Sequence, residues 1–445
     1  MRPFPYFECD DKTLNDAFRI ACGDVEGNVV PYRGGLLAQR EPCLLAGLDY
    51  TQPWTRDAAI NTWYALAMAD GEVTKNTLLS VVETKGGRPV VAGSYGQAWD
   101  NAVWALGARE YLAFHDDADF CAFASEVLRN TLAEYEETAF SEDVGLFSGR
   151  AVYADGIASY PDNVANKLDK EPLYALSTNC VFCEAYRICA RLAQKCGLPH
   201  LAYAQKADSL QRAILRHFPN AATGLFDYFA HESDAQEALG LAYAVLFGIA
   251  DKEQAGRFFD RAHATAHGIP CEWPPVSRYT SFAEGSYGRH SGTVWPMING
   301  AWALAALRAG RADIFGRELS LLAEKAVRDL HFSEIYHPDS GLPYGGMQEW
   351  EGRIVPWQSC RKQTWSATAF LAMLYKGVAG IAAEDGNVTI CPHLPRGVGE
   401  LALTGIEVYG RRFDLRVVRA AGGPSRAEGR AEDFGGREIV LSFHG

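Results

Sequence analysis

The chain has 445 residues, with 42 Lys and Arg against 55 Asp and Glu, so its formal charge at neutral pH is −13. Nearly half of the residues are apolar and 22% are charged, a balance typical of a folded globular protein. This length allows one large domain with an appendage, or two domains. The acidic charge argues against nucleic acid as a partner, because phosphate binding needs a basic surface. A neutral or cationic small substrate, or a sugar, fits this composition better.

The cellular location is predicted from the lack of a signal segment and of a membrane span, and from the pattern of cysteines. Residues 1–10 do not combine a basic segment with an apolar run, so no secretory signal is expected. No apolar stretch approaches the roughly 20 residues that span a bilayer, so no membrane partner is expected either. The 11 cysteines are scattered and odd in number, which predicts free thiols in a reducing cytoplasm. Nothing in the sequence indicates an oligomeric state.

Helical periodicity dominates the first 380 residues and predicts twelve helices. Very short links alternate with links that are mostly long, and antiparallel helical hairpins place alternate links at opposite ends of a bundle. All long loops should therefore lie at one end, where a site would be built. The predicted helices span residues 11–22, 55–70, 72–83, 97–114, 118–136, 174–196, 199–217, 234–248, 252–264, 292–309, 311–330 and 363–378.

This alternation predicts an all-α (α/α)6 barrel over residues 1–382, in which six helical hairpins form a ring. From about residue 385 the pattern changes to short β-rich segments separated by Gly and Pro. We therefore expect a small C-terminal β-sheet module over residues 383–445, packed against the barrel. Strands are predicted at 388–390, 401–409, 412–419 and 438–443. The stretch 421–437, rich in Gly, Arg and Glu, is expected to be an exposed hairpin loop.

The long loops repeatedly pair an aromatic residue with a charged or amide residue. Sugars present an apolar face to aromatic rings and hydroxyl groups to forked polar side chains, so five such loops at one rim predict a carbohydrate subsite. Taken singly, each cluster also fits a local ion pair or the lining of the barrel. The candidate substrate-binding residues are Trp54, Arg56, Asp57, Trp99, Asp100, Tyr160, Trp273, His290, Trp295 and Tyr336.

Hydrolysis of a glycosidic bond requires two carboxyl groups that flank the anomeric carbon, one protonated and one ionised. The predicted loops supply more acids than this, and the residue types alone leave the choice between them open. The candidates are Asp57, Asp100, Asp155, Asp162, Glu272, Glu284, Glu334 and Asp339.

Three stretches resemble known glycosidases. The Trp-Thr-Arg-Asp at 54–57 resembles the glucoamylase motif whose Arg and Asp hold the terminal sugar. Residues 290–299, His-Ser-Gly-Thr-Val-Trp-Pro-Met-Ile-Asn, are similar to a signature of glycoside hydrolase family 63 and mannosylglycerate hydrolases, and 334–341, Glu-Ile-Tyr-His-Pro-Asp-Ser-Gly, match the element that follows it there. Residues 365–367, Trp-Ser-Ala, and the opening segment 6–19, which is similar to α-rhamnosidases, extend the resemblance over most of residues 1–380.

The resemblance implies a six-hairpin glycosidase, most of which invert the anomeric carbon and act on α-linked glucose or mannose. It assigns Glu334 as general base. The family's general acid corresponds best to Asp155, although three residues instead of one separate its Gly from the Tyr-Pro that follows, so Asp162 stays an alternative. Loops on every side and the motif at 54–57 further predict an exo-acting enzyme on short glycosides.

Other functions remain open at this point. A sugar epimerase with the same barrel would use two facing histidines, and His290, His331 and His337 lie at the predicted rim. A polysaccharide lyase, a phosphorylase and a sugar-binding barrel without activity are further alternatives. No metal site and no nucleotide cofactor are expected, because no ligand spacing and no phosphate-binding Gly-rich loop is present.

Overall fold

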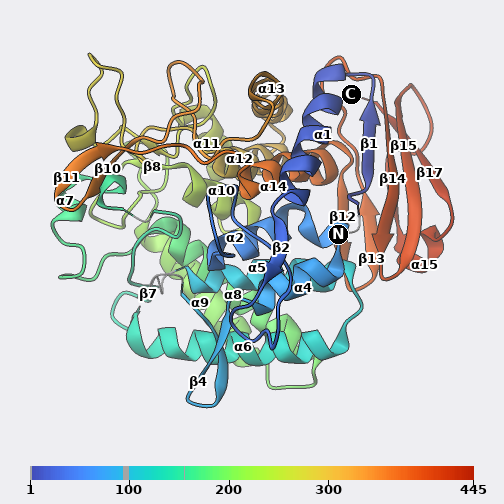
Figure 1. Ribbon diagram of the computed structural model, residues 1–445. Coiled ribbons are helices and arrows are strands. Elements are labelled where there is room, and N and C mark those ends of the chain that lie inside the picture. Colours follow the sequence, from blue (N-terminus) through green and yellow to red (C-terminus); the bar gives the residue numbers. More distant parts are fainter. Residues whose placement is uncertain (1–2, 94–99, 155, 445) are drawn as a thin grey trace.

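The computed structural model of the protein describes residues 3–93, 100–154 and 156–444 (Figure 1). All twelve predicted helices are found there, although the fourth begins only at Trp104. Short π-helical segments join α2 to α3 and extend α14. The helices are α1 (Lys12–Glu26), α2 (Thr55–Asn61), α3 (Ala67–Ala69), α4 (Gly71–Leu79), α5 (Trp104–Phe114), α6 (Ala118–Thr138), α7 (Asp162–Ala165), α8 (Leu176–Lys195), α9 (Leu201–His217), α10 (Ala238–Leu246), α11 (Lys252–Arg261), α12 (Pro296–Arg308), α13 (Ala312–Asp329), α14 (Thr364–Ala372) and α15 (Ala431–Phe434).

Six helices form a closed inner ring. In the order α2, α5, α8, α10, α12 and α14, each packs against the next, and α14 packs against α2. Every residue of α2 and α14 is buried, because an inner helix is covered on all sides. Outer helices such as α9 and α13 bury one face only. The predicted (α/α)6 barrel is thereby confirmed.

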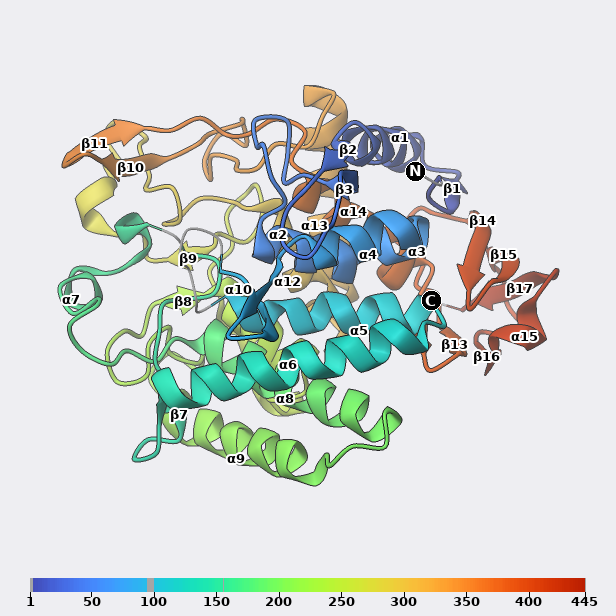
Figure 2. The same ribbon diagram turned by 60° about the horizontal axis from the view of Figure 1, so that its bottom comes forward.

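The two ends of the barrel differ in their connections. At one end, short turns join inner to outer helices; Asp70, for example, ends α3 and caps α4 by accepting backbone N–H bonds from Glu72 and Val73 at 3.0 and 3.1 Å. At the other end, long loops lead into the N-termini of the inner helices. The orange hairpin formed by β10 (Met347–Trp350) and β11 (Arg353–Pro356) belongs to this loop-rich end (Figures 1 and 2). No helix in the described ranges is long and apolar enough to cross a membrane.

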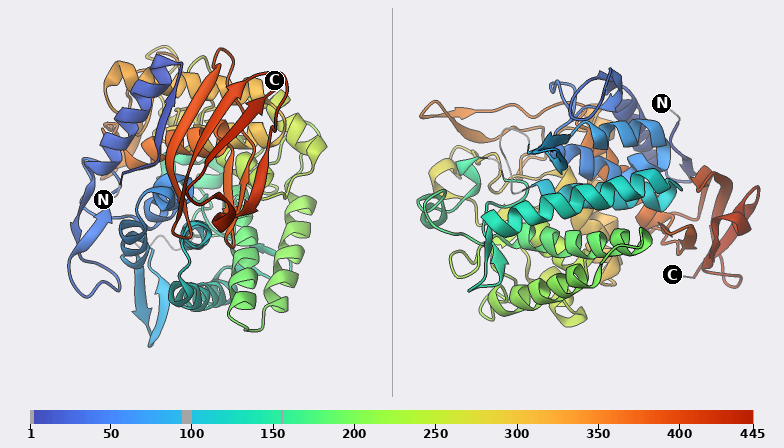
Figure 3. Two further views of the ribbon diagram at one scale, coloured as in Figure 1. Left: turned by 90° about the vertical axis from the view of Figure 1, so that its right-hand side faces the viewer. Right: turned by 90° about the horizontal axis from the view of Figure 1, so that it is seen from below.

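Two small sheets cover the opposite end of the barrel, drawn in red in Figures 1 to 3 except for the blue strand β1. One has the strand order β1-β14-β15-β17, with a parallel pairing only between β15 and β17, and the other has the order β12-β13-β16. The loops at the other end carry short two-stranded pairs. The strands are β1 (Tyr6–Cys9), β2 (Val29–Tyr32), β3 (Glu41–Leu44), β4 (Val82–Lys85), β5 (Arg88–Val91), β6 (Phe140–Ser141), β7 (Leu146–Phe147), β8 (Gln236–Glu237), β9 (Glu272–Trp273), β12 (Ile381–Glu384), β13 (Asn387–Ile390), β14 (Glu400–Val408), β15 (Arg411–Arg419), β16 (Ala427–Arg430) and β17 (Glu438–Phe443).

The sheet module and the barrel share one hydrophobic core. Phe18 of α1, Phe315 of α13 and Phe370 of α14 belong to the same buried cluster as Leu403 and Val417 of the sheet. The boundary suggested at residues 382 and 383 falls within β12, and β1, from the predicted barrel segment, pairs with β14. The division of the chain into two domains stays a prediction.

The predicted loop at 421–437 is wrong in part, because β16 and α15 lie within it. Its local composition gave no signal for either element. β16 is held by backbone pairing with β13, and α15 buries Ala431 and Phe434 against the sheet. Both stabilising contacts come from segments distant in sequence.

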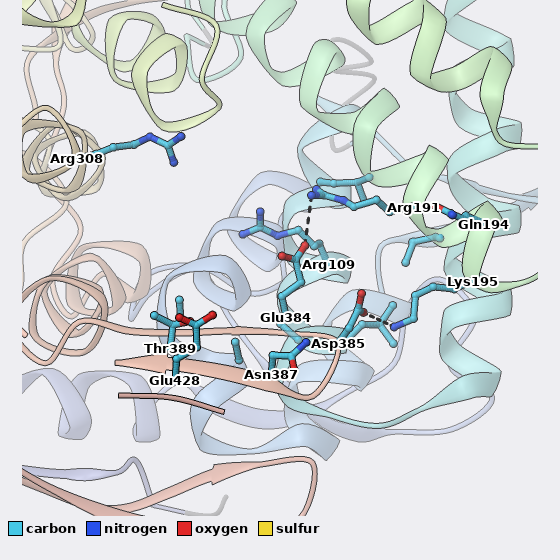
Figure 4. Close-up of a pocket in the computed structure, with 16 residues that line it drawn as sticks. Arg109, Arg191, Gln194, Lys195, Arg308, Glu384, Asp385, Asn387, Thr389 and Glu428 are labelled. Carbon is cyan, nitrogen blue, oxygen red and sulfur yellow. Dashed lines mark hydrogen bonds and ion pairs between the residues drawn. The ribbon is translucent and has the colours of Figure 1, made fainter. Parts of the chain in front are cut away.

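A hollow of about 890 Å³ separates the short-loop end of the barrel from the sheet module (Figure 4). Arg191 of α8 faces Glu384 of β12 across it, with an N···O distance of 3.4 Å, and Lys195 pairs with Asp385 at 2.5 Å. These ion pairs join the module to the barrel. The hollow lies at the end opposite to the long loops.

A cavity in the shared core should destabilise barrel and module together. We expect Leu403→Ala, at a completely buried position of β14, to lower the free energy of unfolding by about 2–5 kcal/mol. Thermal unfolding should remain a single transition at a lower temperature. The control Val440→Ala, at a position 49% exposed on β17, should change stability by no more than about 0.5 kcal/mol. Two separate transitions, with only one of them shifted, would contradict a shared core.

Candidate active site

A cavity of about 580 Å³ opens at the loop-rich end, where the inner helices begin. Five indole rings form much of its wall, and four charged side chains face it. The described residues that line it are Tyr50, Trp54, Arg56, Asp57, Arg289, Trp295, Glu334, Gln348, Trp350, Trp357, Gln363 and Trp365. Of the residues predicted from sequence, it therefore brings together Trp54, Arg56, Asp57, Trp295 and Glu334.

Glu334 lies in the loop after α13 and is only 3% exposed. The Tyr50 hydroxyl donates a hydrogen bond to its Oε1 at 2.8 Å, and Arg289 Nη2 donates to its Oε2 at 2.7 Å. The Cys360 backbone N–H approaches the same Oε2 at 3.4 Å, while the Glu334 N–H donates to the Cys360 carbonyl at 2.9 Å. Both carboxylate oxygens thus meet donors that complement a negative charge.

Arg289 connects this carboxylate to the cavity wall. Its guanidinium also donates to the carbonyl groups of Gly345 and Gln358 at 3.2 and 3.5 Å. It lies over the Trp295 ring, 5.4 Å from the ring centroid, and the Trp295 indole N–H donates back to the Arg289 carbonyl at 3.0 Å. The positions of the ring and of Glu334 are therefore fixed together.

Arg56 and Asp57 occupy the first turn of the inner helix α2. Arg56 Nη1 donates to the Val152 carbonyl at 3.0 Å and lies 3.8 Å from Asp100 Oδ2. Asp57 Oδ1 accepts a long hydrogen bond of 3.5 Å from Gln363 Nε2. A helix N-terminus favours a carboxylate, so α2 presents a cation and an anion side by side to the cavity, suited to vicinal hydroxyl groups.

Asp100 and His290 lie behind the cavity wall instead of on it. Asp100 is 1% exposed next to Arg56. His290 is equally buried, and its ring stacks on that of Trp295 with centroids 4.6 Å apart. On its other side it packs against Tyr153 at 6.0 Å. Both residues therefore support residues that line the cavity.

Three further predicted sugar contacts do not lie on the described cavity wall. Tyr160 is completely buried among aromatic rings, and its hydroxyl donates to the Ala154 carbonyl at 2.7 Å. Trp273 stacks on His263 with centroids 3.8 Å apart. Tyr336 is completely buried, and its backbone pairs with Val294. Each residue belongs to a polar loop motif in sequence, but the side chains of Tyr160 and Tyr336 fill buried space around the site, and the half-buried Trp273 packs on His263.

The catalytic acid predicted from sequence, Asp155, lies outside the described residues, as does Trp99. The alternative acid, Asp162, is at the start of α7, where its side chain is 55% exposed and pairs with Arg278. Asp162 is not among the described residues that line the cavity.

Several lining residues were not among the predicted site residues. Arg289 directly precedes His290 in a motif that was recognised, so its sequence position could have identified it. Tyr50, in contrast, donates a hydrogen bond to Glu334, which lies 284 positions further along the chain. No local sequence pattern indicates that contact. The others are Gln348, Trp350, Trp357, Gln363 and Trp365.

Two further carboxyl groups are completely buried inside the loop-rich end of the barrel. Glu237 of β8 and Glu272 of β9 are direct partners in an antiparallel pair. Glu237 Oε2 accepts the Ser177 N–H at 3.0 Å, whereas within the described ranges both Glu272 oxygens are without a hydrogen-bond partner. Burial raises the pKa of Glu237 to about 8, and burial together with the nearby Glu237 charge raises the pKa of Glu272 well above its ordinary value. Both groups should hold protons near neutral pH.

Residues 58–366 match the family model described as the mannosylglycerate hydrolase MGH1-like glycoside hydrolase domain, which covers more than half of the chain. The chain belongs to this family. No curated protein matches the sequence. The family assignment agrees with the resemblance drawn from residues 290–299 and 334–341.

Solved structures show the same fold at low sequence identity. A sialidase superposes with a TM-score of 0.70 at 14% identity, covering 96% of this chain and 40% of its own. The GH78 rhamnosidase of Bacillus sp. GL1 gives 0.66 at 16% identity, with coverages of 98% and 44%. The GH63 mannosylglycerate hydrolase of Thermus thermophilus in complex with glucose gives 0.55 at 15% identity, with coverages of 79% and 98%. This chain thus spans about two fifths of the length of the sialidase and the rhamnosidase.

Protonation of Glu237 should make stability depend on pH. The unfolded chain loses this proton near the ordinary pKa of 4.5, whereas the folded protein keeps it up to about pH 8. The free energy of unfolding should therefore decrease as the pH rises from about 4.5 to 8. One such group lowers it by up to about 1.4 kcal/mol per pH unit. In urea unfolding between pH 5 and 8, Glu237→Gln should lose less stability than wild type. The exposed control Glu142→Gln should keep the wild-type slope, and an equal slope in Glu237→Gln would contradict a buried, protonated Glu237.

Proposed function

We propose that the protein is an exo-acting glycosidase that hydrolyses short α-linked glucosides or mannosides with inversion at the anomeric carbon. One observation carries the proposal: in a chain of a glycoside hydrolase family, Glu334 is held between Arg289 and Tyr50 on the wall of a Trp-lined cavity. Aromatic walls with few, fixed polar groups suit a sugar ring.

The terminal sugar binds, in this proposal, between Trp54 and the first turn of α2. Arg56 offers donors and Asp57 offers acceptors to neighbouring hydroxyl groups, and the indole ring covers the apolar sugar face. A cavity of about 580 Å³ is in the range of sites for small ligands. This size supports action on a chain end or a short glycoside over binding along a polymer.

Glu334 acts as general base in the proposed mechanism. It takes a proton from a water molecule as that water attacks the anomeric carbon, and its hydrogen bonds to Tyr50 and Arg289 hold the carboxylate in place for this transfer. Inversion requires room for the water, so the acid should lie roughly 6.5–9.5 Å from Glu334.

Asp155 stays the proposed general acid, protonating the departing oxygen. Two residues before it, Tyr153 is completely buried and packs against His290, which stacks on the cavity residue Trp295. The chain at Tyr153 therefore lies beside residues that support the cavity wall, which supports Asp155 as the acid. Burial also raises the pKa of Glu237 and of Glu272, but neither residue is among the described residues that line the cavity.

A histidine-based epimerase is less well supported. His290 is buried behind Trp295, His331 is 3.2 Å from the Ser333 hydroxyl, and His337 is 2.7 Å from the Gly285 carbonyl. None of the three is among the described lining residues. Epimerisation would need two histidines that face each other across the substrate. These three positions do not provide such a pair.

We also propose a cytoplasmic location. All 11 cysteines are free thiols, and two of them, Cys121 and Cys196, remain unlinked with their sulfur atoms 3.9 Å apart. Burial raises the pKa of Cys121 to about 11, which disfavours the reactive thiolate. A reducing compartment suits such a set.

Removing the base should abolish turnover without disturbing the fold. We expect Glu334→Gln to lower kcat on α-glucosides or α-mannosides by at least about 100-fold, because the amide cannot accept the proton from water. The measurement is initial rates with p-nitrophenyl glycosides, beside circular dichroism to check folding. Glu142→Gln, at an exposed position between β6 and β7, is the matched control and should keep the wild-type rate. A near-normal rate in Glu334→Gln would refute Glu334 as the general base. The activity would then have to depend on other residues.

The stereochemical outcome tests the proposed geometry independently. Direct attack by water on an α-glycoside should release the β-anomer first. Proton NMR during the first minutes, before mutarotation equilibrates the anomers, should show this signal ahead of the α-anomer. Initial release of the α-anomer would indicate retention through a covalent intermediate, and with it a carboxyl separation near 5 Å.

A further inference from the structure

Two exposed indole rings stand at the mouth of the cavity on the β10–β11 hairpin. Trp350, at the end of β10, is 55% exposed, and Trp357, directly after β11, is 38% exposed. Their ring centroids are 5.8 Å apart at an interplanar angle of 49°. Both rings line the same cavity as Glu334. Large apolar groups left in water beside a cavity indicate a surface that a ligand covers.

The base of this hairpin is fixed to the catalytic frame. The Met347 N–H donates to the Tyr287 carbonyl at 2.8 Å, and the Arg289 N–H donates to the Met347 carbonyl at 2.9 Å. Gly346 has a φ of +78°, and a Cβ at this position would lie 2.4 Å from Arg289 Cα, so only glycine permits this approach. The residue that holds Glu334 therefore also positions the two rings.

Gln348, on β10 between this base and Trp350, adds a polar group to the same wall. Its Oε1 is buried and accepts no hydrogen bond from any described residue. A buried amide oxygen without a donor costs free energy. Because Gln348 lines the cavity, a ligand hydroxyl group could supply the missing donor.

The charges around the cavity favour a neutral ligand at this position. Among the described lining residues the cations are Arg56 and Arg289. Arg289 pairs with Glu334 and with two carbonyl groups, and Arg56 with Asp100 and a carbonyl group. Of the residues outside the description, 94–99 and 155 include no Lys or Arg. An acidic leaving group would therefore meet two carboxylates, Asp57 and Glu334, and cations already committed to other partners.

We propose that the β10–β11 hairpin forms the leaving-group subsite and selects a neutral sugar ring. The ring would stack on Trp350 and Trp357 while one of its hydroxyl groups donates to Gln348. This inference rests on the proposed glycosidase function and specifies its substrates as neutral α-linked disaccharides, in preference to glycosides of acids such as glycerate.

The test compares substrates with and without a leaving-group ring. α-Glucosyl and α-mannosyl fluorides occupy only the terminal-sugar subsite, and the reactive fluoride identifies the accepted sugar. The α-linked disaccharide and the glycerate glycoside of that sugar are then compared. For wild type, kcat/KM should be at least about 10-fold higher for the disaccharide than for the glycerate glycoside. For Trp350→Ala and Trp357→Ala, the ratio of kcat/KM for the disaccharide to that for the fluoride should fall roughly 10-fold.

Two controls separate stacking from general damage. Trp350→Phe keeps an aromatic face and should restore most of the ratio. Phe282→Ala removes another exposed ring of the loop-rich end, 68% exposed and absent from the cavity lining, and should leave the ratio unchanged. A second measurement is calorimetric binding of the disaccharide to Glu334→Gln, in which adding Trp350→Ala should weaken affinity about 10-fold.

The outcomes distinguish this inference from the function on which it rests. If wild type hydrolyses neither fluoride nor any disaccharide, the proposed function fails, and the leaving-group subsite fails with it. If the fluoride is hydrolysed but the glycerate glycoside is preferred, or the Trp variants leave the ratio and the affinity unchanged, only the present inference is overturned.

Discussion

Arg289 and Glu334 form an ion pair at 2.7 Å in which both side chains are less than a tenth exposed. Burying two charges costs several kcal/mol per ion, and attraction offsets this only when the remaining hydrogen-bonding groups are also satisfied. Tyr50, the Cys360 N–H and two backbone carbonyl groups fulfil that condition. Because Arg289 also contacts Trp295 and the start of the β10–β11 hairpin, this one residue fixes the positions of Glu334, the cavity wall and the rim.

The barrel explains why such a site can exist at only one of its ends. Every inner helix begins there, and the first turn of a helix leaves backbone N–H groups that favour acidic or hydrogen-bonding partners. Asp57 and Glu237 stand at these helix starts, and Asp24 of α1 accepts the Phe332 N–H at 2.7 Å just before Glu334. The closed helix ring holds the loops rigidly, and the loops supply the chemistry.

Prediction from the sequence worked where a pattern is local. Helix periodicity and the alternation of short and long links gave the barrel, and the motif around Glu334 placed that residue in the loop where the cavity forms. Prediction failed where the deciding contact lies far away in the chain. Tyr336 and Tyr160 have the composition of sugar contacts, yet packing buries their side chains completely. The segment with β16 and α15 reads as a loop because its partners are β13 and the rest of the sheet.

The sequence by itself determined the all-α barrel, its loop-rich end and a set of aromatic and acidic residues gathered there, because each depends on spacing within one or two helices. Only the tertiary structure decided which of those residues share a cavity, which acids are buried and keep their protons, and which cations are already paired. Those properties depend on burial and on distances between side chains hundreds of positions apart, as between Tyr50 and Glu334. Desolvation and long-range hydrogen bonding produce no periodic pattern in the amino-acid sequence.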